Sequence, residues 1–200
     1  MHLLSRFALM SLAVLGVSAF SSNISLYAAG QSSGMAANQG ASFGVQYTSP
    51  DGAFTARFPK IPHRESVSVP LSSGNGSITQ DVYLSLNKEG ITYIITAIQY
   101  PQQYDTSVPQ KLFETLMNGM AKAGPNYQLL NSQPGEFQGM PCLDFNISNE
   151  DLVIRSKAFL TGHTIYVITL IATKKDDVDS LFKQFIDSFS LSKQAQAAKA

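Results

Sequence analysis

The thiol of Cys142, the single cysteine of the chain, is the most obvious nucleophile in this sequence. A thiol enzyme needs a histidine beside the sulfur, and outside the N-terminal segment only His63 and His163 are available. His63 follows Pro62 in a stretch expected to run along a sheet edge, whereas Gly162-His163 is typical of a two-residue turn. Neither histidine lies in a catalytic motif, and a lone cysteine is usually inert. The sequence therefore predicts a protein that is not an enzyme, with Cys142, His63 and His163 as the candidate ligand-binding residues.

Other reactive constellations are weaker still. No G-x-S-x-G motif is present, and Ser73 to Ser77 is a glycine-containing loop that simply turns the chain. No glycine-rich phosphate cradle opens a helix, which disfavours nucleotide binding. The acidic groups at 150–151 and 176–179 could hold a hard cation, but a turn and a helix N-terminus explain them. We therefore expect no metal and no cofactor.

Tyrosines form the remaining candidate surface. They could line a groove, although in a β-rich domain such residues mostly fill the spaces between strands. The tyrosines concerned are Tyr83, Tyr93, Tyr100, Tyr104 and Tyr127.

The charges of the chain are balanced, with 14 Lys and Arg against 14 Asp and Glu. Because no run of Lys or Arg is present, the chain has no electrostatic footprint for nucleic acid or for an anionic membrane. A single cysteine forms no internal disulfide, so stability must come from packing.

The N-terminus has the pattern of a secretory signal peptide, predicted here as residues 1–29. Arg6 precedes an apolar run from Phe7 to Ala19 that is too short for a confident membrane span. Cleavage after Ala19 competes with cleavage after Ala28 or Ala29, and both remain open. No cysteine near either position would carry a lipid, so we expect an exported protein, periplasmic or secreted, without membrane insertion. Residues 30–42 are small, polar and glycine-rich, which predicts a flexible leader, and 192–200 are predicted to be a disordered tail.

The stretch from Asp151 to Leu191 organises the fold. Strand-like runs at 152–161 and 164–172 are joined by Gly162-His163, and the second run is apolar on both faces, as a central strand would be. A helix with Asp176 as its cap should follow and cover the sheet. Its apolar stripe is Val178, Leu181, Phe182, Phe185, Ile186 and Phe189.

The earlier elements complete an α+β plan. We expect a hairpin from Phe43 to Pro59, an extended edge at 60–69, a loop at 71–77, and a strand from Ile78 whose wetter face carries Tyr83 and Ser85. A central strand at 91–100 precedes a helix from Ser107 to Ala123, with a capping box of Ser107 and Gln110. Strands at 127–132 and 140–148 follow, separated by turn signals at Pro134-Gly135 and Gln138-Gly139, and the second strand has Leu143, Phe145 and Ile147 on one face. Since hairpin-length connections dominate, the sheet should be largely antiparallel and covered by helices.

Three segments of the chain resemble the PsbP-like superfamily, which includes the photosystem II extrinsic P subunit and many exported bacterial proteins. They are FTARFPKIP at 54–62, AFLTGHTIYVITL at 158–170 and FKQFIDSFSL at 182–191. The resemblance covers residues 43–191 and implies an α/β/α sandwich. It also implies a non-enzymatic exported module of the kind that docks onto or helps to assemble a larger complex. No functional residue of the family maps onto this sequence.

These observations predict an exported, non-catalytic binding or assembly module that acts on another protein of the bacterial envelope or outside the cell. The alternative is a small-ligand carrier or a small enzyme that uses a pocket between sheet and helix. The oligomeric state stays open.

Overall fold

The computed structural model describes residues 43–71, 76–124, 126–193 and 195. The predicted signal peptide, the predicted leader and most of the predicted loop at 71–77 lie outside the described residues. Neither helix among the described residues has the length and apolarity needed to cross a bilayer.

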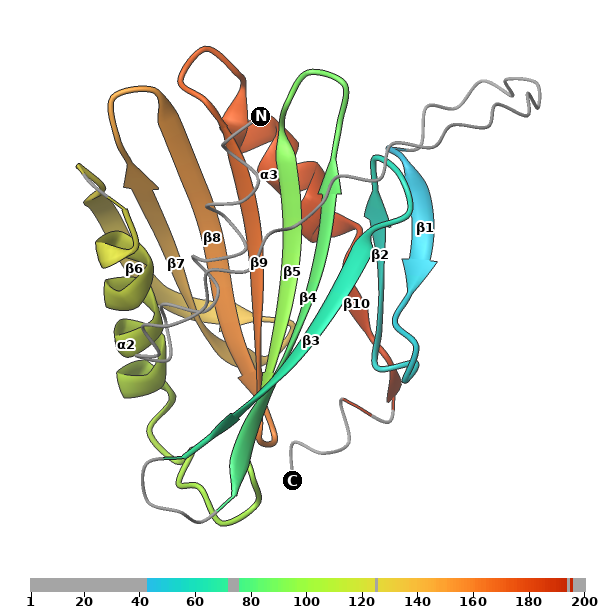
Figure 1. Cartoon of the computed structure of the whole chain (residues 1–200), viewed down its shortest axis with the longest axis vertical. Coiled ribbons are helices and arrows are strands. Elements are labelled where there is room, and N and C mark those ends of the chain that lie inside the picture. The colour runs from blue at the N-terminus through green and yellow to red at the C-terminus, as the bar shows by residue number, and fades with distance from the viewer. Residues whose placement is uncertain (1–42, 72–75, 125, 194, 196–200) are drawn as a thin grey trace.

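The centre of the fold is a seven-stranded antiparallel sheet with the order β3-β4-β5-β9-β8-β7-β6 (Figure 1). Its middle strand, β9, is buried from Ile165 to Ala172, which confirms the central strand predicted from its two apolar faces. The strands are β3 (His63–Pro70), β4 (Ser77–Leu86), β5 (Thr92–Gln99), β6 (Gln128–Phe137), β7 (Met140–Ser148), β8 (Leu152–Thr161) and β9 (Thr164–Thr173).

One face of this sheet is covered by helix α2, Pro109–Lys122, which packs on β6, β7 and β8. Phe113, Leu116 and Met117 are its buried residues. They join the face of β7 that carries Phe145 and Ile147, as the alternation of that strand predicted.

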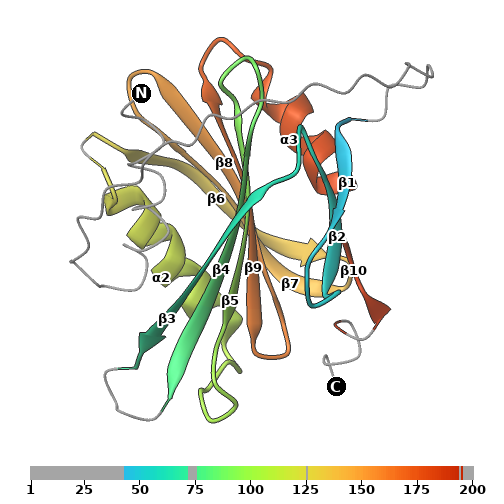
Figure 2. The ribbon, with the colours of Figure 1, turned by 45° about the vertical axis from the view of Figure 1, so that its right-hand side comes forward.

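The other face has two covers, which Figure 2 shows on the side opposite α2. Helix α3, Val178–Asp187, packs on β8 and β9. A second, three-stranded sheet lies beside it, formed by β1 (Val45–Thr48), β2 (Phe54–Phe58) and β10 (Ser190–Leu191) in the order β1-β2-β10. The α+β class with an antiparallel sheet covered by helices is confirmed, and so is the hairpin predicted from Phe43 to Pro59, which is formed by β1 and β2. The addition of β10 and the separation of these strands into a second, small sheet were not predicted.

The small sheet corrects one expectation about β4. Tyr83 and Ser85 were assigned to a wetter face, but they are 2% and 1% exposed. The ring of Phe54 from β2 lies edge-on to Tyr83, with 5.1 Å between centroids. The Ser85 hydroxyl donates to the Lys60 carbonyl and accepts from the Lys60 N–H. This face is buried because strands from both ends of the domain, β1, β2 and β10, form the small sheet that covers it.

The helix ends also differ from the prediction. Asp177, and not Asp176, caps α3 by accepting from the Ser180 N–H, while Asp176 accepts from the Thr173 N–H and hydroxyl. Phe189 lies beyond α3, in the connection to β10.

The capping box predicted for the first helix is wrong. Val108 occupies the N-cap of α2 and makes no side-chain cap, whereas the Ser107 N–H donates to Asp105. Pro109 stands in the first turn as expected, where its missing N–H costs nothing.

Strand β6 is longer than predicted. Pro134-Gly135 was interpreted as a turn, but the strand continues through both residues to Phe137. Proline is tolerated there because β6 is an edge strand, with one row of backbone groups facing no neighbour. The chain turns at Gln138 and Gly139, whose φ angles of 51° and 74° are those of a hairpin turn.

Residues 192, 193 and 195 of the predicted tail lie among the described residues, and two of them contact the domain. The Ser192 N–H donates to the Ala53 carbonyl at 2.8 Å, and the Thr161 hydroxyl donates to the Ala195 carbonyl at 3.0 Å. Residues 194 and 196–200 lie outside the described residues.

Phe185→Ala should destabilise the domain by about 3–5 kcal/mol, because it removes a fully buried ring. Phe185 lies 5.4 Å from Phe58 and 5.2 Å from Tyr93, centroid to centroid, so it joins the small sheet to the large one. Gln184→Ala, at the exposed neighbouring position on α3, should change the unfolding free energy by less than about 0.5 kcal/mol. Urea unfolding measures both, and equal effects would contradict this packing.

Candidate functional site

Cys142 lies in β7 and is 1% exposed. It pairs with Gly135 of β6 on one side and with Phe159 of β8 on the other. Burial raises the pKa of its thiol, with a smaller opposing effect from the charge of Lys157. A raised pKa keeps the sulfur protonated, which is the opposite of what a nucleophile needs.

The structure does not bring His63 near this thiol. His63 begins β3, at one edge of the sheet, and is exposed. Five inter-strand steps separate β3 from β7, or about 24 Å at the usual spacing of about 4.8 Å.

His163 occupies the β8–β9 turn, as the sequence predicted. Its carbonyl accepts from the Tyr100 N–H at 2.8 Å. Its ring lines a cavity of about 250 Å³ that Asp51, Asp81 and Gln99 also line, whereas Cys142 does not. The buried Nδ1 atom has no hydrogen-bond partner among the described residues.

The tyrosines mostly fill the core. Tyr83, Tyr93 and Tyr100 are buried, and desolvation raises the pKa of each to about 12. Tyr104 packs on Tyr100 with 4.7 Å between ring centroids, and Tyr127 packs against the cluster beneath α2. They line no common groove.

The acidic stretches have local explanations. Asp176 and Asp177 bond the backbone at the start of α3, and Asn149 organises the turn at 150–151 by accepting from the Asp151 and Leu152 N–H groups. Among the described ranges, no group of three or more His, Cys, Asp or Glu side chains could hold a metal ion.

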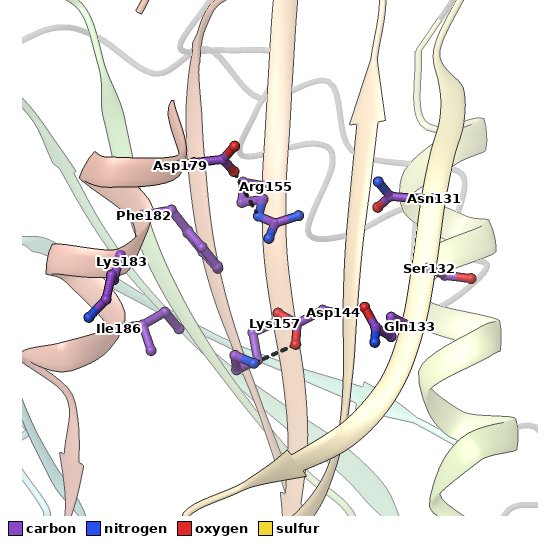
Figure 3. A pocket seen from close by; sticks show the side chains of 10 residues that line it. All are labelled: Asn131, Ser132, Gln133, Asp144, Arg155, Lys157, Asp179, Phe182, Lys183 and Ile186. Atoms are coloured by element: carbon purple, nitrogen blue, oxygen red, sulfur yellow. Dashed lines mark hydrogen bonds and ion pairs between the residues drawn. The ribbon is translucent and has the colours of Figure 1, made fainter. Parts of the chain in front are cut away.

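A larger cavity, of about 700 Å³, lies between α3 and the outer strands β6, β7 and β8. We call it the α3 groove, and Figure 3 shows it from close by. Its lining residues are Asn131, Ser132, Gln133, Asp144, Arg155, Lys157, Asp179, Phe182, Lys183 and Ile186.

The floor of the α3 groove consists of two cross-strand rungs. Strand register aligns Asn131, Asn146 and Arg155 in one rung, and Gln133, Asp144 and Lys157 in the next. Residues two apart in a strand point to the same face, so all six share the side on which α3 lies. The third rung consists of Gly135, Cys142 and Phe159 and is apolar. Phe137, two residues further along β6, packs on Phe159 with 5.0 Å between ring centroids.

Lys157 is neutralised within the groove. Its Nζ lies 2.5 Å from Asp144 Oδ2, and the two side chains are 14% and 28% exposed. The same ammonium lies 5.5 Å from the centroid of the Phe137 ring. This pair is a fixed part of the floor.

Arg155 is held differently. Its Nε lies 3.5 Å from Asp179 Oδ1, beyond a good hydrogen bond, and the Asp179 side chain is 86% exposed. Its Cζ lies 5.6 Å from the centroid of the Phe182 ring. The buried Nε and the buried Asn146 Oδ1 of the same rung have no hydrogen-bond partner among the described residues. In Figure 3 the guanidinium points away from α3 toward β6, where Asn131 points back into the groove.

Sequence reasoning missed these residues as a site. A signal was present in β8, where Arg155 and Lys157 alternate with Ile154, Ser156 and Ala158, all fully buried. Two cations on one face of an otherwise apolar strand indicate a face that is only half covered.

No family model matches the chain, and no curated protein matches it. Among solved structures, cyanobacterial PsbP from Synechocystis sp. PCC 6803 matches at 14% identity with a TM-score of 0.49, over 80% of this chain and 98% of that chain. A protein of unknown function from Pseudomonas aeruginosa matches at 14% identity with a TM-score of 0.40, over 70% of this chain and 91% of that chain. A protein from Bacteroides thetaiotaomicron matches at 12% identity with a TM-score of 0.39, over 76% of this chain and 50% of that chain. These are similarities to other proteins, and nothing about the function of this chain follows from them.

The Cys142 thiol should be inert in the folded protein. At about pH 8, a disulfide reagent should modify native protein at least about a hundredfold more slowly than urea-unfolded protein, because the sulfur is buried and its pKa is raised. Absorbance of the released thiolate measures both rates. Modification of the native protein at the unfolded rate would contradict the burial of this side chain.

Proposed function

We propose that this chain is an exported, non-catalytic binding or assembly module and that the α3 groove is the surface with which it holds a protein partner. The observation that carries this proposal is the guanidinium of Arg155. It stands in an open groove with no close hydrogen bond, whereas the neighbouring Lys157 is closely paired. A cation left without a close partner on rigid strands is available to a partner's acidic or polar group.

The chemistry of the lining favours a protein over a small molecule. Small-molecule pockets are mostly lined by apolar residues with a few polar groups. In the α3 groove, by contrast, the rung that contains Arg155 and the rung that contains Lys157 consist entirely of polar or charged residues. The groove is bordered by β6, an exposed edge strand on which Leu130, at the register shift between Leu129 and Asn131, is 57% exposed. Apolar side chains next to a polar groove enlarge the surface that a protein partner would bury.

A non-catalytic role agrees with the state of the reactive side chains. The thiol of Cys142 is buried and its pKa is raised, and the groove lining contains neither Cys142 nor a histidine. The groups in the groove are suited to holding a partner by charge and hydrogen bonds.

The second candidate is a small-ligand carrier or a small enzyme. The volume of the groove, about 700 Å³, lies within the range of small-molecule sites, and the groove lies between a sheet and a helix. A small molecule from the growth medium that remains bound through purification, and is lost on Arg155→Glu, would favour this candidate.

Capture from cells tests the proposal. The full-length chain, tagged at its C-terminus and expressed in a bacterial host, is cross-linked in the intact envelope and purified from the periplasmic fraction and the medium. We expect the chain in one of these fractions, shortened by 19, 28 or 29 residues according to intact mass, together with a specific protein partner.

Two matched double variants compare the face of the sheet that carries the α3 groove with the face that is covered by α2. Arg155→Glu with Lys183→Glu should reduce the captured partner at least about tenfold. Lys111→Glu with Lys122→Glu makes the same charge change at exposed positions of α2, on the opposite face, and should leave capture unchanged. A cytoplasmic chain, or equal capture by both variants, would contradict the proposal.

A further inference from the structure

We propose that Arg155 is the receptor for a carboxylate on an acidic, extended segment of the partner, and that Asp179 occupies this receptor in the free protein. This inference rests on the proposed binding function and deepens it. It specifies the chemical group that the partner presents, and it specifies Asp179 as the residue that must release Arg155 when the partner binds.

Arg155 is the cation of the groove that has no close partner. Lys157 is paired with Asp144, and Lys183 with Asp187 on the next turn of α3. Arg155 has only the 3.5 Å approach of Asp179 to its Nε. No hydrogen bond occupies its two terminal nitrogens among the described residues.

A second Arg–Asp–aromatic cluster in the same molecule provides the comparison. On β3 and β4, Arg64 donates to Asp81 Oδ1 from Nε at 3.2 Å and from Nη2 at 2.8 Å, and its Cζ lies 5.9 Å from the Tyr83 ring. That guanidinium is already satisfied by a carboxylate. Arg155 has the same kinds of neighbour, but its carboxylate is held only at 3.5 Å from Nε, which marks it as a receptor.

The guanidinium of Arg155 is already positioned for a planar anion. Phe182 lies 5.6 Å from it, and β8 holds its stem between two neighbouring strands. A guanidinium with two free parallel N–H groups matches a carboxylate with two hydrogen bonds, and less side-chain entropy is lost when the group is held beforehand.

The charge around the groove favours a carboxylate over a phosphate. The cations Arg155, Lys157 and Lys183 are balanced by the carboxylates of Asp144, Asp179 and Asp187. When Asp179 turns away, one positive charge is left. A single carboxylate neutralises it, whereas a phosphate dianion would bring excess negative charge beside Asp144.

The spacing of the floor favours an extended segment. The rung with Asn131, Asn146 and Arg155 and the rung with Gln133, Asp144 and Lys157 are two residues apart along each strand. This is about 6.8 Å, the distance between alternate residues of any extended peptide. A segment lying along the strands can therefore place its carboxylate at Arg155 and its next inward side chain or backbone group over Gln133.

Asp179 is suited to leave. It is 86% exposed, so releasing its single long contact exposes little new surface. It also lies in the first turn of α3, where the helix dipole stabilises a carboxylate without any help from Arg155. An exposed ion pair of this kind contributes little, so a partner's carboxylate competes with it readily.

The test uses a ten-residue peptide of alternating Glu and Ser, acetylated and amidated at its ends and labelled with fluorescein. Fluorescence anisotropy measures its affinity for the full-length protein at low salt. Two control peptides replace each Glu with Gln, or each Glu with Ser and each original Ser with phosphoserine. We expect the Glu peptide to bind at least about tenfold more tightly than either control.

Variants then separate the roles of the two residues. Arg155→Gln should weaken the Glu peptide at least about tenfold, whereas Asp179→Asn should tighten it about two- to fivefold by removing the internal competitor. In the Arg155→Gln background, Asp179→Asn should have no effect, since the competition acts only at Arg155. Arg64→Gln is the matched control and should leave binding unchanged.

A urea unfolding curve accompanies each variant. If Arg155→Gln unfolds the domain, Arg155→Lys keeps the stem and the charge without the planar fork, and it should still lose several-fold in affinity. Weaker binding by Asp179→Asn, equal binding of the Gln peptide, or preference for the phosphoserine peptide would each overturn the inference. A partner captured through the groove that the Glu peptide does not displace would overturn this inference alone and leave the proposed function standing.

Discussion

The two apolar faces of β9 are the constraint on which the rest of the structure depends. A strand that is buried from Ile165 to Ala172 needs a cover on each side, and neither helix alone is large enough. Helix α2 covers one face, while α3 and the small sheet divide the other. These last two covers leave the outer strands β6 and β7 open on their side of the sheet, while α3 packs on β8 and β9. The α3 groove lies where α3 meets these open strands.

Within a single strand, the residues that face a covering helix are apolar and the residues that face the groove are polar. In β7 the face toward α2 carries Phe145 and Ile147, whereas the opposite face carries Asp144 and Asn146. In β8 the residues that share the groove face are Arg155 and Lys157. The same hydrogen-bonded strands that bury the core therefore hold the charges of the groove at fixed spacings. A site built in this way needs little reorganisation to bind, which is a reason to look for function there instead of at Cys142.

Much of the fold could be predicted, because hydrophobic periodicity and turn chemistry are local. They gave the central strand, the hairpin at Gly162 and both covering helices. The second sheet could not be found in this way, since it pairs Phe54 near the start of the domain with Leu191 near its end. Its packing over β4, where Phe54 and Tyr47 contact Tyr83, is likewise a long-range contact. The continuation of β6 through Pro134 could not be predicted for a similar reason, because a proline fits within this strand only when the strand lies at the edge of the sheet.

The groove escaped prediction because its residues come from four elements and meet only through strand register. The claim that this groove is the partner-binding surface is tested most directly by amide hydrogen exchange on the purified complex and the free chain. The account predicts slower exchange in β6, in β8 around Arg155 and Lys157 and at the start of α3, with α2 and β3 unchanged. Protection confined to α2 or to β3 would contradict it.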